Sequence, residues 1–145
     1  MNSQNRATLW GVSVGHAAYD TWFGLAPLML AALSGSMALS NADIGLILLL
    51  YQATSSVAQP FFGRLTERIG GRPLAVGSIL WTTALFSASL FVDSKWLLAT
   101  CIGLSGLGSA AWHPQGAANA TLAGGSSRGA TAASVFFLGG TLGAS

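Results

Sequence analysis

The sequence predicts an all-α integral membrane protein, and three observations support this fold class. Only 7% of the 145 residues are charged, whereas a soluble domain carries about a quarter. Hydrophobic residues make up 52% of the chain, and the mean hydropathy is +0.59. The apolar segments are also long enough to cross a bilayer, which takes about 20 residues of helix. Lipid is therefore the expected surrounding of most of the chain.

Five apolar segments follow one another, and each is expected to form one membrane span. A helix rises about 1.5 Å per residue, so about 20 residues cover the apolar core. Four segments meet this length, but the fifth has only 16 residues before the sequence stops. The chain is therefore expected to be a partial N-terminal transmembrane bundle, as a fragment or a truncated gene product. The predicted spans are about 8–33, 42–62, 73–91, 96–122 and 130–145, the last one incomplete.

The first predicted span carries two ionisable side chains, His16 and Asp20. Their spacing of four residues places them on one face of a helix, within hydrogen-bonding reach. Counted from the cytoplasmic end, they lie roughly 12 and 18 Å deep. Ionisable groups near the membrane midplane are costly and usually functional. The pair is interpreted as a proton-carrying or substrate-contacting site, with a structural pair between helices as the alternative.

The fourth predicted span contains "SAAWHPQGAAN", with His113, Gln115 and Asn119. His113 lies roughly 13 Å from the cytoplasmic end, a depth similar to that of the first pair. It is a candidate cavity residue, although it could instead donate to a carbonyl freed by Pro114. In the second span, Gln52 is a candidate for the cavity or for hydrogen bonding between helices. No metal-ligand spacing is present, so neither a metal ion nor a cofactor is expected.

The basic residues predict the orientation of the chain. If the spans alternate, one side carries five arginines and the other only Lys95. The positive-inside rule places the larger group in the cytoplasm, together with the N-terminus. The net charge of +2 then needs no nucleic-acid partner. The five arginines are Arg6, Arg64, Arg68, Arg72 and Arg128.

The charged segment "GRLTERIGGRP" resembles the loop between the second and third helices of the major facilitator superfamily. That loop has the pattern G-x-L-a-D-r-x-G-r-k, and Glu67 here replaces the usual aspartate. The resemblance implies a loop that latches one conformation on the cytoplasmic side. The residues assigned to this latch are Gly63, Glu67, Arg68, Gly70 and Arg72.

Further segments resemble the fosmidomycin-resistance branch of that superfamily. Its pattern H-x-x-x-D-x-x-x-G-x-x-P in helix one is similar to His16, Asp20, Gly24 and Pro27. Its G-x-G-S-x-x-x-H-P segment in helix four is similar to the segment 106–114, and "LGGTLGAS" resembles the start of helix five. Gln115 departs from the branch, in which an acidic residue commonly follows the His-Pro pair.

The resemblance implies a twelve-helix transporter in the cell membrane, with a bacterial inner membrane expected. It would export a drug or another small molecule in exchange for protons by alternating access. Asp20 and His16 would couple protons, while His113, Gln115, Asn119 and Gln52 would line the substrate cavity. The implied partners are lipid, protons, an unidentified small molecule and the missing C-terminal helices.

Two other classes of membrane protein are alternatives to a transporter. A membrane-embedded hydrolase is disfavoured because neither G-x-S-x-G nor H-E-x-x-H is present, so the chain is not expected to be an enzyme. A small non-catalytic membrane subunit, or a degraded gene product that acts only with a partner chain, remains the alternative.

Overall fold

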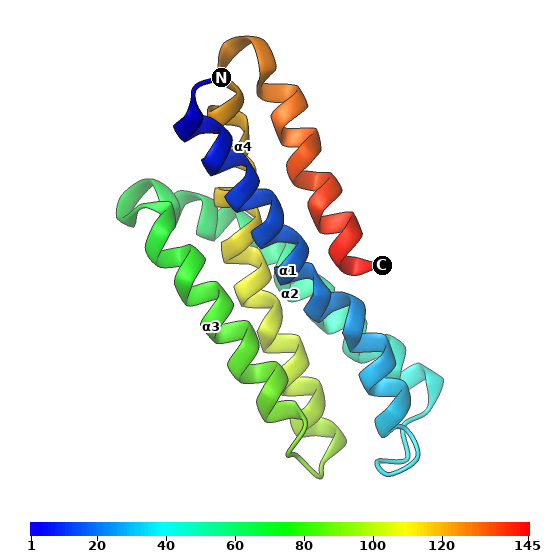
Figure 1. Cartoon of the computed structure of the whole chain (residues 1–145). Helices are drawn as coiled ribbons and strands as arrows, with labels where there is room; N and C mark the ends of the chain where they lie inside the picture. The colour runs from blue at the N-terminus through cyan, green and yellow to red at the C-terminus, as the bar shows by residue number, and fades with distance from the viewer. The chain divides into compact units, whose positions relative to one another are not determined.

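The computed structural model describes residues 1–145 and contains only helices (Figure 1). Its helices cover the segments predicted from the apolar pattern and extend some of them. Their bounds are α1 Ser3–Leu33, α2 Asn41–Ile69, α3 Gly71–Ser89 and α4 Lys95–Ala144.

Helix α4 consists of two helical parts that meet at Gly125. The backbone there has φ 67° and ψ −171°, a combination that is essentially restricted to glycine. The two parts correspond to the predicted fourth and fifth segments, which the sequence separates by a polar stretch rich in small residues. The glycine therefore provides the whole connection between them.

The chain forms two compact units. Unit 1 contains Met1–Gly24 and His113–Ser145, and unit 2 contains Leu25–Trp112. In each unit several helical segments pack together through buried small side chains.

The predicted loop 63–73 is almost entirely helical, which corrects its assignment as a loop. Helix α2 continues to Ile69, and α3 begins at Gly71. The Arg, Leu and Glu residues in this segment have high helix propensity, so the helix continues beyond the apolar span. Only Gly70 leaves the helical conformation, with φ 83°. A single glycine therefore forms the tight turn between the two helices.

Buried and exposed side chains are distributed in a way that suits a lipid environment. Large apolar side chains such as Val57 and Phe91 are 80% and 87% exposed, while several hydroxyl side chains, among them Thr82, Ser89 and Ser105, are fully buried. By length and composition, one helix, Asn41–Ile69, is apolar enough to cross a membrane. The expectation of four complete spans is therefore not confirmed. Gly, Ser and Thr residues lower the average hydropathy of the other helices.

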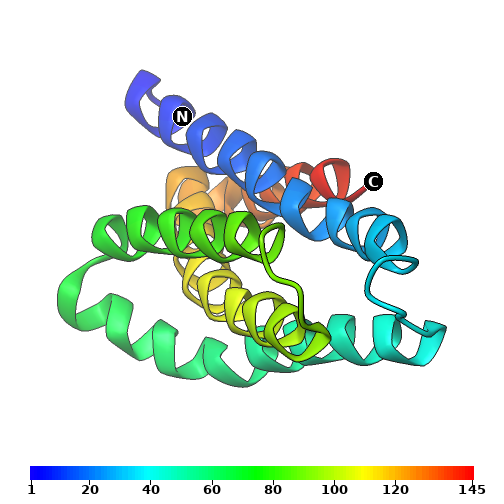
Figure 2. The same ribbon diagram turned by 90° about the horizontal axis from the view of Figure 1, so that it is seen from below.

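In unit 2, the 95–112 part of α4 packs between α2 and α3 (Figure 2). Ser55 on α2 donates a hydrogen bond of 2.9 Å to Ser109. The indole of Trp81 on α3 donates to the carbonyl of Leu104 at 2.9 Å. Hydrogen bonds between small polar side chains and backbone groups thus join these helices, as is common inside membranes.

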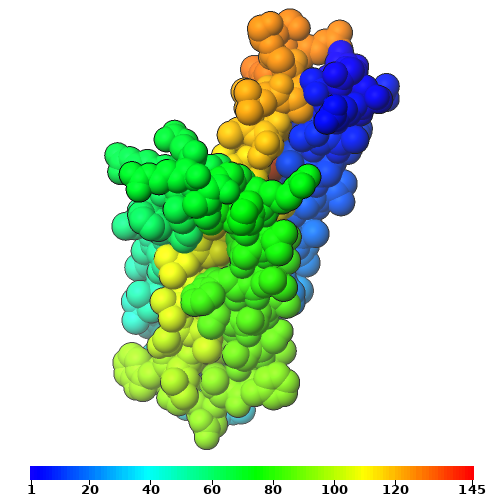
Figure 3. Space-filling view, turned by 90° about the vertical axis from the view of Figure 1, so that its left-hand side faces the viewer, coloured from blue at the N-terminus to red at the C-terminus, as the bar shows by residue number.

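An apolar groove lies between α2, α3 and α4 within unit 2. Figure 3 shows this face, with part of α4 (yellow) visible between green and cyan residues of α2 and α3. Its lining contains Ser78 as the one polar side chain. The lining residues are Phe62, Pro73, Leu74, Gly77, Ser78, Trp81, Leu107, Gly108 and Ala111.

Gly106 allows the closest approach of α4 to α2. A Cβ atom at this position would meet the carbonyl oxygen of Tyr51 and would lie 3.0 Å from the backbone nitrogen of Ser55. We expect Gly106→Ala to lower the free energy of unfolding by about 1–2 kcal/mol, because rigid backbone cannot move aside. Thermal unfolding of the detergent-purified protein measures this effect.

The matched control is Gly103→Ala, one helical turn earlier. Its Cβ would meet only the Leu50 side chain, at 3.4 Å, so its melting temperature should change much less. Equal destabilisation by the two substitutions would contradict close α2–α4 packing at Gly106.

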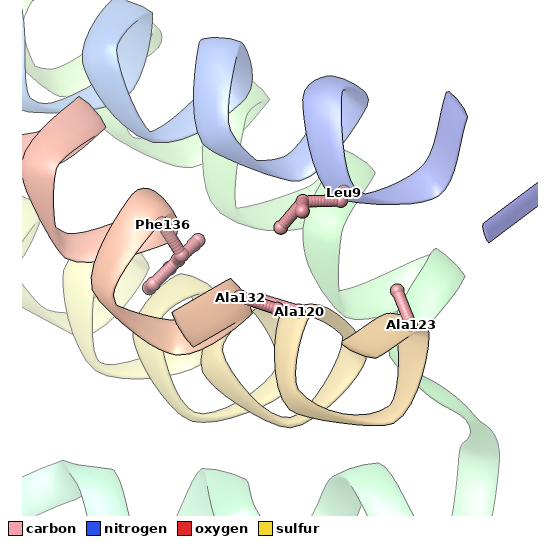
Figure 4. Packing of buried hydrophobic residues seen from close by; sticks show 5 residues of the cluster. All are labelled: Leu9, Ala120, Ala123, Ala132 and Phe136. Atoms are coloured by element: carbon pink, nitrogen blue, oxygen red, sulfur yellow. The ribbon is translucent and has the colours of Figure 1, made fainter. Parts of the chain in front are cut away.

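Unit 1 has a small core formed by residues far apart in the sequence (Figure 4). Leu9 on α1 packs with the fully buried Phe136 and with three alanines of α4. The alanines allow the helical segments to approach closely. The core residues are Leu9, Ala120, Ala123, Ala132 and Phe136.

Candidate functional site

The site in unit 1 is built from α1 and the two parts of α4. After the turn at Gly125, the segment 126–144 runs back beside the segment 113–124 (Figure 1). Gly116 makes this approach possible, because a Cβ there would lie 2.7 Å from the Phe136 ring. The turn thus brings Phe136 to the helix that carries His113.

His16, Asp20 and His113 form one contiguous group. The Nε2 atom of His16 lies 3.1 Å from Oδ2 of Asp20, and the Nε2 atom of His113 lies 3.4 Å from Oδ1 of the same carboxyl group. The two imidazole rings are 4.8 Å apart in an edge-to-face arrangement. The structure therefore brings together the three ionisable residues that the sequence placed at similar depth.

The ring of His16 is held on several sides. It is only 3% exposed and stacks on Phe136 with a centroid distance of 4.0 Å. Its Nδ1 atom lies 2.8 Å from the carbonyl oxygen of Phe136. A carbonyl oxygen can only accept a hydrogen bond, so Nδ1 must carry a hydrogen.

This hydrogen bond determines what the other ring nitrogen can do. In a neutral His16 with hydrogen on Nδ1, Nε2 carries a lone pair, and it lies 3.1 Å from Oδ2 of Asp20 without hydrogen-bond geometry. A lone pair and a carboxylate oxygen 3.1 Å apart repel each other, so a proton on either residue would stabilise the contact.

The same group is compact enough to bind a metal ion. One ligand atom from each of the three residues lies within 4.8 Å of the others. A proton and a metal cation would both neutralise the repulsion described above. A bound proton and a bound metal ion would differ in their response to a protonophore and to a metal chelator.

Comparison with known proteins places this site in a family. The sequence pattern of the Major Facilitator Superfamily matches residues 12–145. The chain belongs to the major facilitator superfamily. It is also 33% identical over 133 residues to an uncharacterized MFS-type transporter, YfnC, of Bacillus subtilis (strain 168). No solved structure matches the chain.

The chain spans only part of this relative. The match covers 91% of the chain but 32% of the length of the Bacillus protein. Membership of the superfamily implies a membrane-embedded protein and points to transport in general rather than to catalysis. The fosmidomycin-resistance branch remains a resemblance.

The other predicted cavity residues lie in both units of this superfamily member. Gln115 and Asn119 are neighbours in unit 1, where the amide nitrogen of Asn119 lies 3.2 Å from Oε1 of Gln115. The Nε2 atom of Gln115 is buried and has no hydrogen-bond partner. Gln52 lies in unit 2 and donates to Ser56 Oγ at 3.3 Å. The structure therefore brings Gln115 and Asn119 together, while Gln52 bonds within its own helix.

The predicted latch residues lie around the α2–α3 turn in unit 2. Gly63, Glu67 and Arg68 belong to the end of α2, and Arg72 belongs to the first turn of α3. Glu67 forms no ion pair with Arg72.

Two groups at the site were missed by sequence reasoning, namely the Phe136 carbonyl and Gly140. A Cβ at Gly140 would meet Cε1 of His16 and would lie 2.8 Å from Oδ2 of Asp20. The available signal was the spacing of Gly139 and Gly143, which forms the G-x-x-x-G pattern of close helix packing. That pattern indicates a helix contact but does not identify the helix that is contacted.

Proposed function

We propose that the chain is the N-terminal part of a proton-coupled secondary transporter for a small molecule. The observation that carries this proposal is the contact of His16 Nε2 with Asp20 Oδ2, which a bound proton would stabilise. A site that holds a proton inside a helical bundle can bind it on one side of the membrane and release it on the other. Alternating access would supply the change of side.

Asp20 is the proposed proton carrier, and the two histidines are its exchange partners. Each histidine contacts a different oxygen of the Asp20 carboxyl group. His16 is almost fully buried, whereas the His113 side chain is 24% exposed. The proposed route therefore runs from the cavity through His113 to Asp20, which carries the proton and shares it with His16.

The substrate cavity is proposed to lie beside His113. Gln115 supports this assignment, because its buried amide nitrogen has no partner in the chain and such a group favours a hydrogen-bonding ligand. Asn119, which contacts Gln115, belongs to the same proposed set of cavity residues. An exported metabolite or drug with hydrogen-bond acceptors would satisfy the Gln115 nitrogen.

Location and orientation are part of the same proposal. Four complete helices and part of a fifth would cross the cell membrane, with the N-terminus in the cytoplasm. The exposed apolar side chains of all four helices and the five arginines on one predicted side support this topology. The α2–α3 turn with Glu67, Arg68 and Arg72 would then be a cytoplasmic latch against the C-terminal helices.

Efflux of fosmidomycin tests the proposal. The complete reading frame that encodes the chain is expressed in a susceptible bacterium, and accumulation of radiolabelled fosmidomycin is measured. We expect lower accumulation than in vector-only cells, and we expect a protonophore to remove the difference. Efflux that survives the protonophore but is lost with a metal chelator would contradict proton coupling and would favour a metal ion at the site.

A further inference from the structure

The side of His16 opposite Asp20 is occupied by one short stretch of the segment 126–144. The Phe136 ring stacks on the imidazole, and the Phe136 carbonyl accepts from Nδ1. In a regular α-helix that carbonyl is also the acceptor for the backbone N–H of residue 140, four positions later. Phe136 and Gly140 therefore form a single surface against the histidine.

Gly140 keeps this surface open. A Cβ at position 140 would collide with Cε1 of His16 and approach Oδ2 of Asp20 to 2.8 Å. Any other residue would therefore displace the imidazole from the Phe136 carbonyl. Because Gly140 has no side chain, His16 on α1 can reach the Phe136 carbonyl of another helical segment.

We propose that Gly140 and the Phe136 carbonyl are positioning groups that hold His16 in the Nδ1–H form, with Nε2 left as the unprotonated nitrogen 3.1 Å from Asp20. The remaining titratable side chain in contact with this pair is His113, which lies edge-on to His16. Without the carbonyl, His16 could turn, place its hydrogen on Nε2 and donate it to Asp20. The positioning groups thus prevent an ordinary His–Asp hydrogen bond and leave Nε2 able to accept a proton.

Nitrogen-15 NMR of the histidine side chains tests this inference in the detergent-purified protein. The chain contains two histidines, so the variant His113→Gln leaves the signal of His16 alone. In that background we expect Nδ1 of His16 to carry hydrogen. Gly140→Ala should remove this signature, with hydrogen moving to Nε2 or exchanging between the nitrogens. An unchanged His16 signature in Gly140→Ala would overturn the inference.

The matched control is Gly24→Ala, which crowds the same two helical segments elsewhere. Its Cβ would lie 2.9 Å from the carbonyl oxygen of Ala144, and its three nearest atoms all belong to Ala144 rather than to His16 or Asp20. We expect the His16 signature to survive in this variant. Equal loss in Gly24→Ala would show that helix separation alone is responsible, and it would overturn the role of Gly140.

A second variant separates the carbonyl from the aromatic ring. Phe136→Leu removes the stacked ring but keeps the backbone carbonyl, so hydrogen should stay on Nδ1. Loss of the signature in this variant would assign the positioning to the ring and contradict the proposal.

The functional consequence rests on the proposed transport. Gly140→Ala should reduce gradient-driven transport by about 10- to 100-fold, because displacement of a reacting group by about 1 Å has effects of this size. The NMR measurement does not depend on transport, so failure of the proposed function would leave the tautomer result intact. A normal transport rate combined with a changed tautomer would overturn the coupling of Gly140 to proton transfer.

Discussion

Asp20→Asn is expected to reduce gradient-driven transport to the level of membranes without the protein. Asparagine has nearly the same shape as aspartate, but its amide cannot take up or release a proton. Asp20 is the one acidic residue in contact with both histidines, so no other carboxyl group at the site can replace it. Uptake into proteoliposomes with an imposed pH gradient measures the loss.

The matched control is Asp93→Asn, which makes the same change in the exposed connection between α3 and α4. Its transport rate and its yield in the membrane should equal those of the unmodified protein. If Asp20→Asn still moved substrate uphill at a normal rate, Asp20 would not be the proton carrier. If both variants failed to insert into the membrane, the comparison would report on folding instead of coupling.

The second large effect is expected at Gly125, where the two parts of α4 meet. Its φ of 67° and ψ of −171° are available to glycine but strongly unfavourable for a β-branched residue. We expect Gly125→Val to lower the free energy of unfolding by about 3 kcal/mol, at the upper end of the cost of such strain. Displacement of the segment 126–144 should also remove the His16–Phe136 hydrogen bond and abolish transport.

The cause of this effect is backbone conformation and not crowding. A Cβ at Gly125 would have no atom within 4 Å. Ser126→Val introduces the same side chain at the next exposed position, where the backbone is helical, and should change the melting temperature only slightly. A similar loss of stability in both variants would show that the conformation at Gly125 is not the decisive feature.

The sequence predicted the part of the site that depends on helical periodicity. The spacing of His16 and Asp20 placed both on one face of a helix, and counting along the fourth segment gave His113 a similar depth. Both inferences need only the rise and period of an α-helix. The contacts of Asp20 with both histidines agree with them.

The contribution of the segment 126–144 could not be predicted in the same way. The partner of His16 is a backbone carbonyl, and every residue has one, so the sequence carries no sign of it. Its position also depends on the conformation of Gly125, which sets the direction of the returning helix. The segment 63–73 was predicted to be a loop because it is charged. Its charged residues also have high helix propensity, so the segment is helical.

The glycines of the last segment have a mechanical consequence. Gly139 lies against the backbone of Ser13, and Gly143 lies against the backbone of Ala17, four residues further along each helix. The contact therefore repeats with the same spacing on both helices and contains no interlocking side chains. Sliding by one turn, about 5.4 Å, would place Gly143 against Ser13 in an equivalent register.

The two registers would differ at the proton site. In the second register, Ala144 would take the place of Gly140, and its methyl group would stand where the His16–Asp20 contact now lies. The glycine contacts would be restored after the step, but Phe136 would leave the core of unit 1, and the histidine and the carboxyl group would have to separate. A one-turn ratchet of the last segment would thus open the contact that holds the proton.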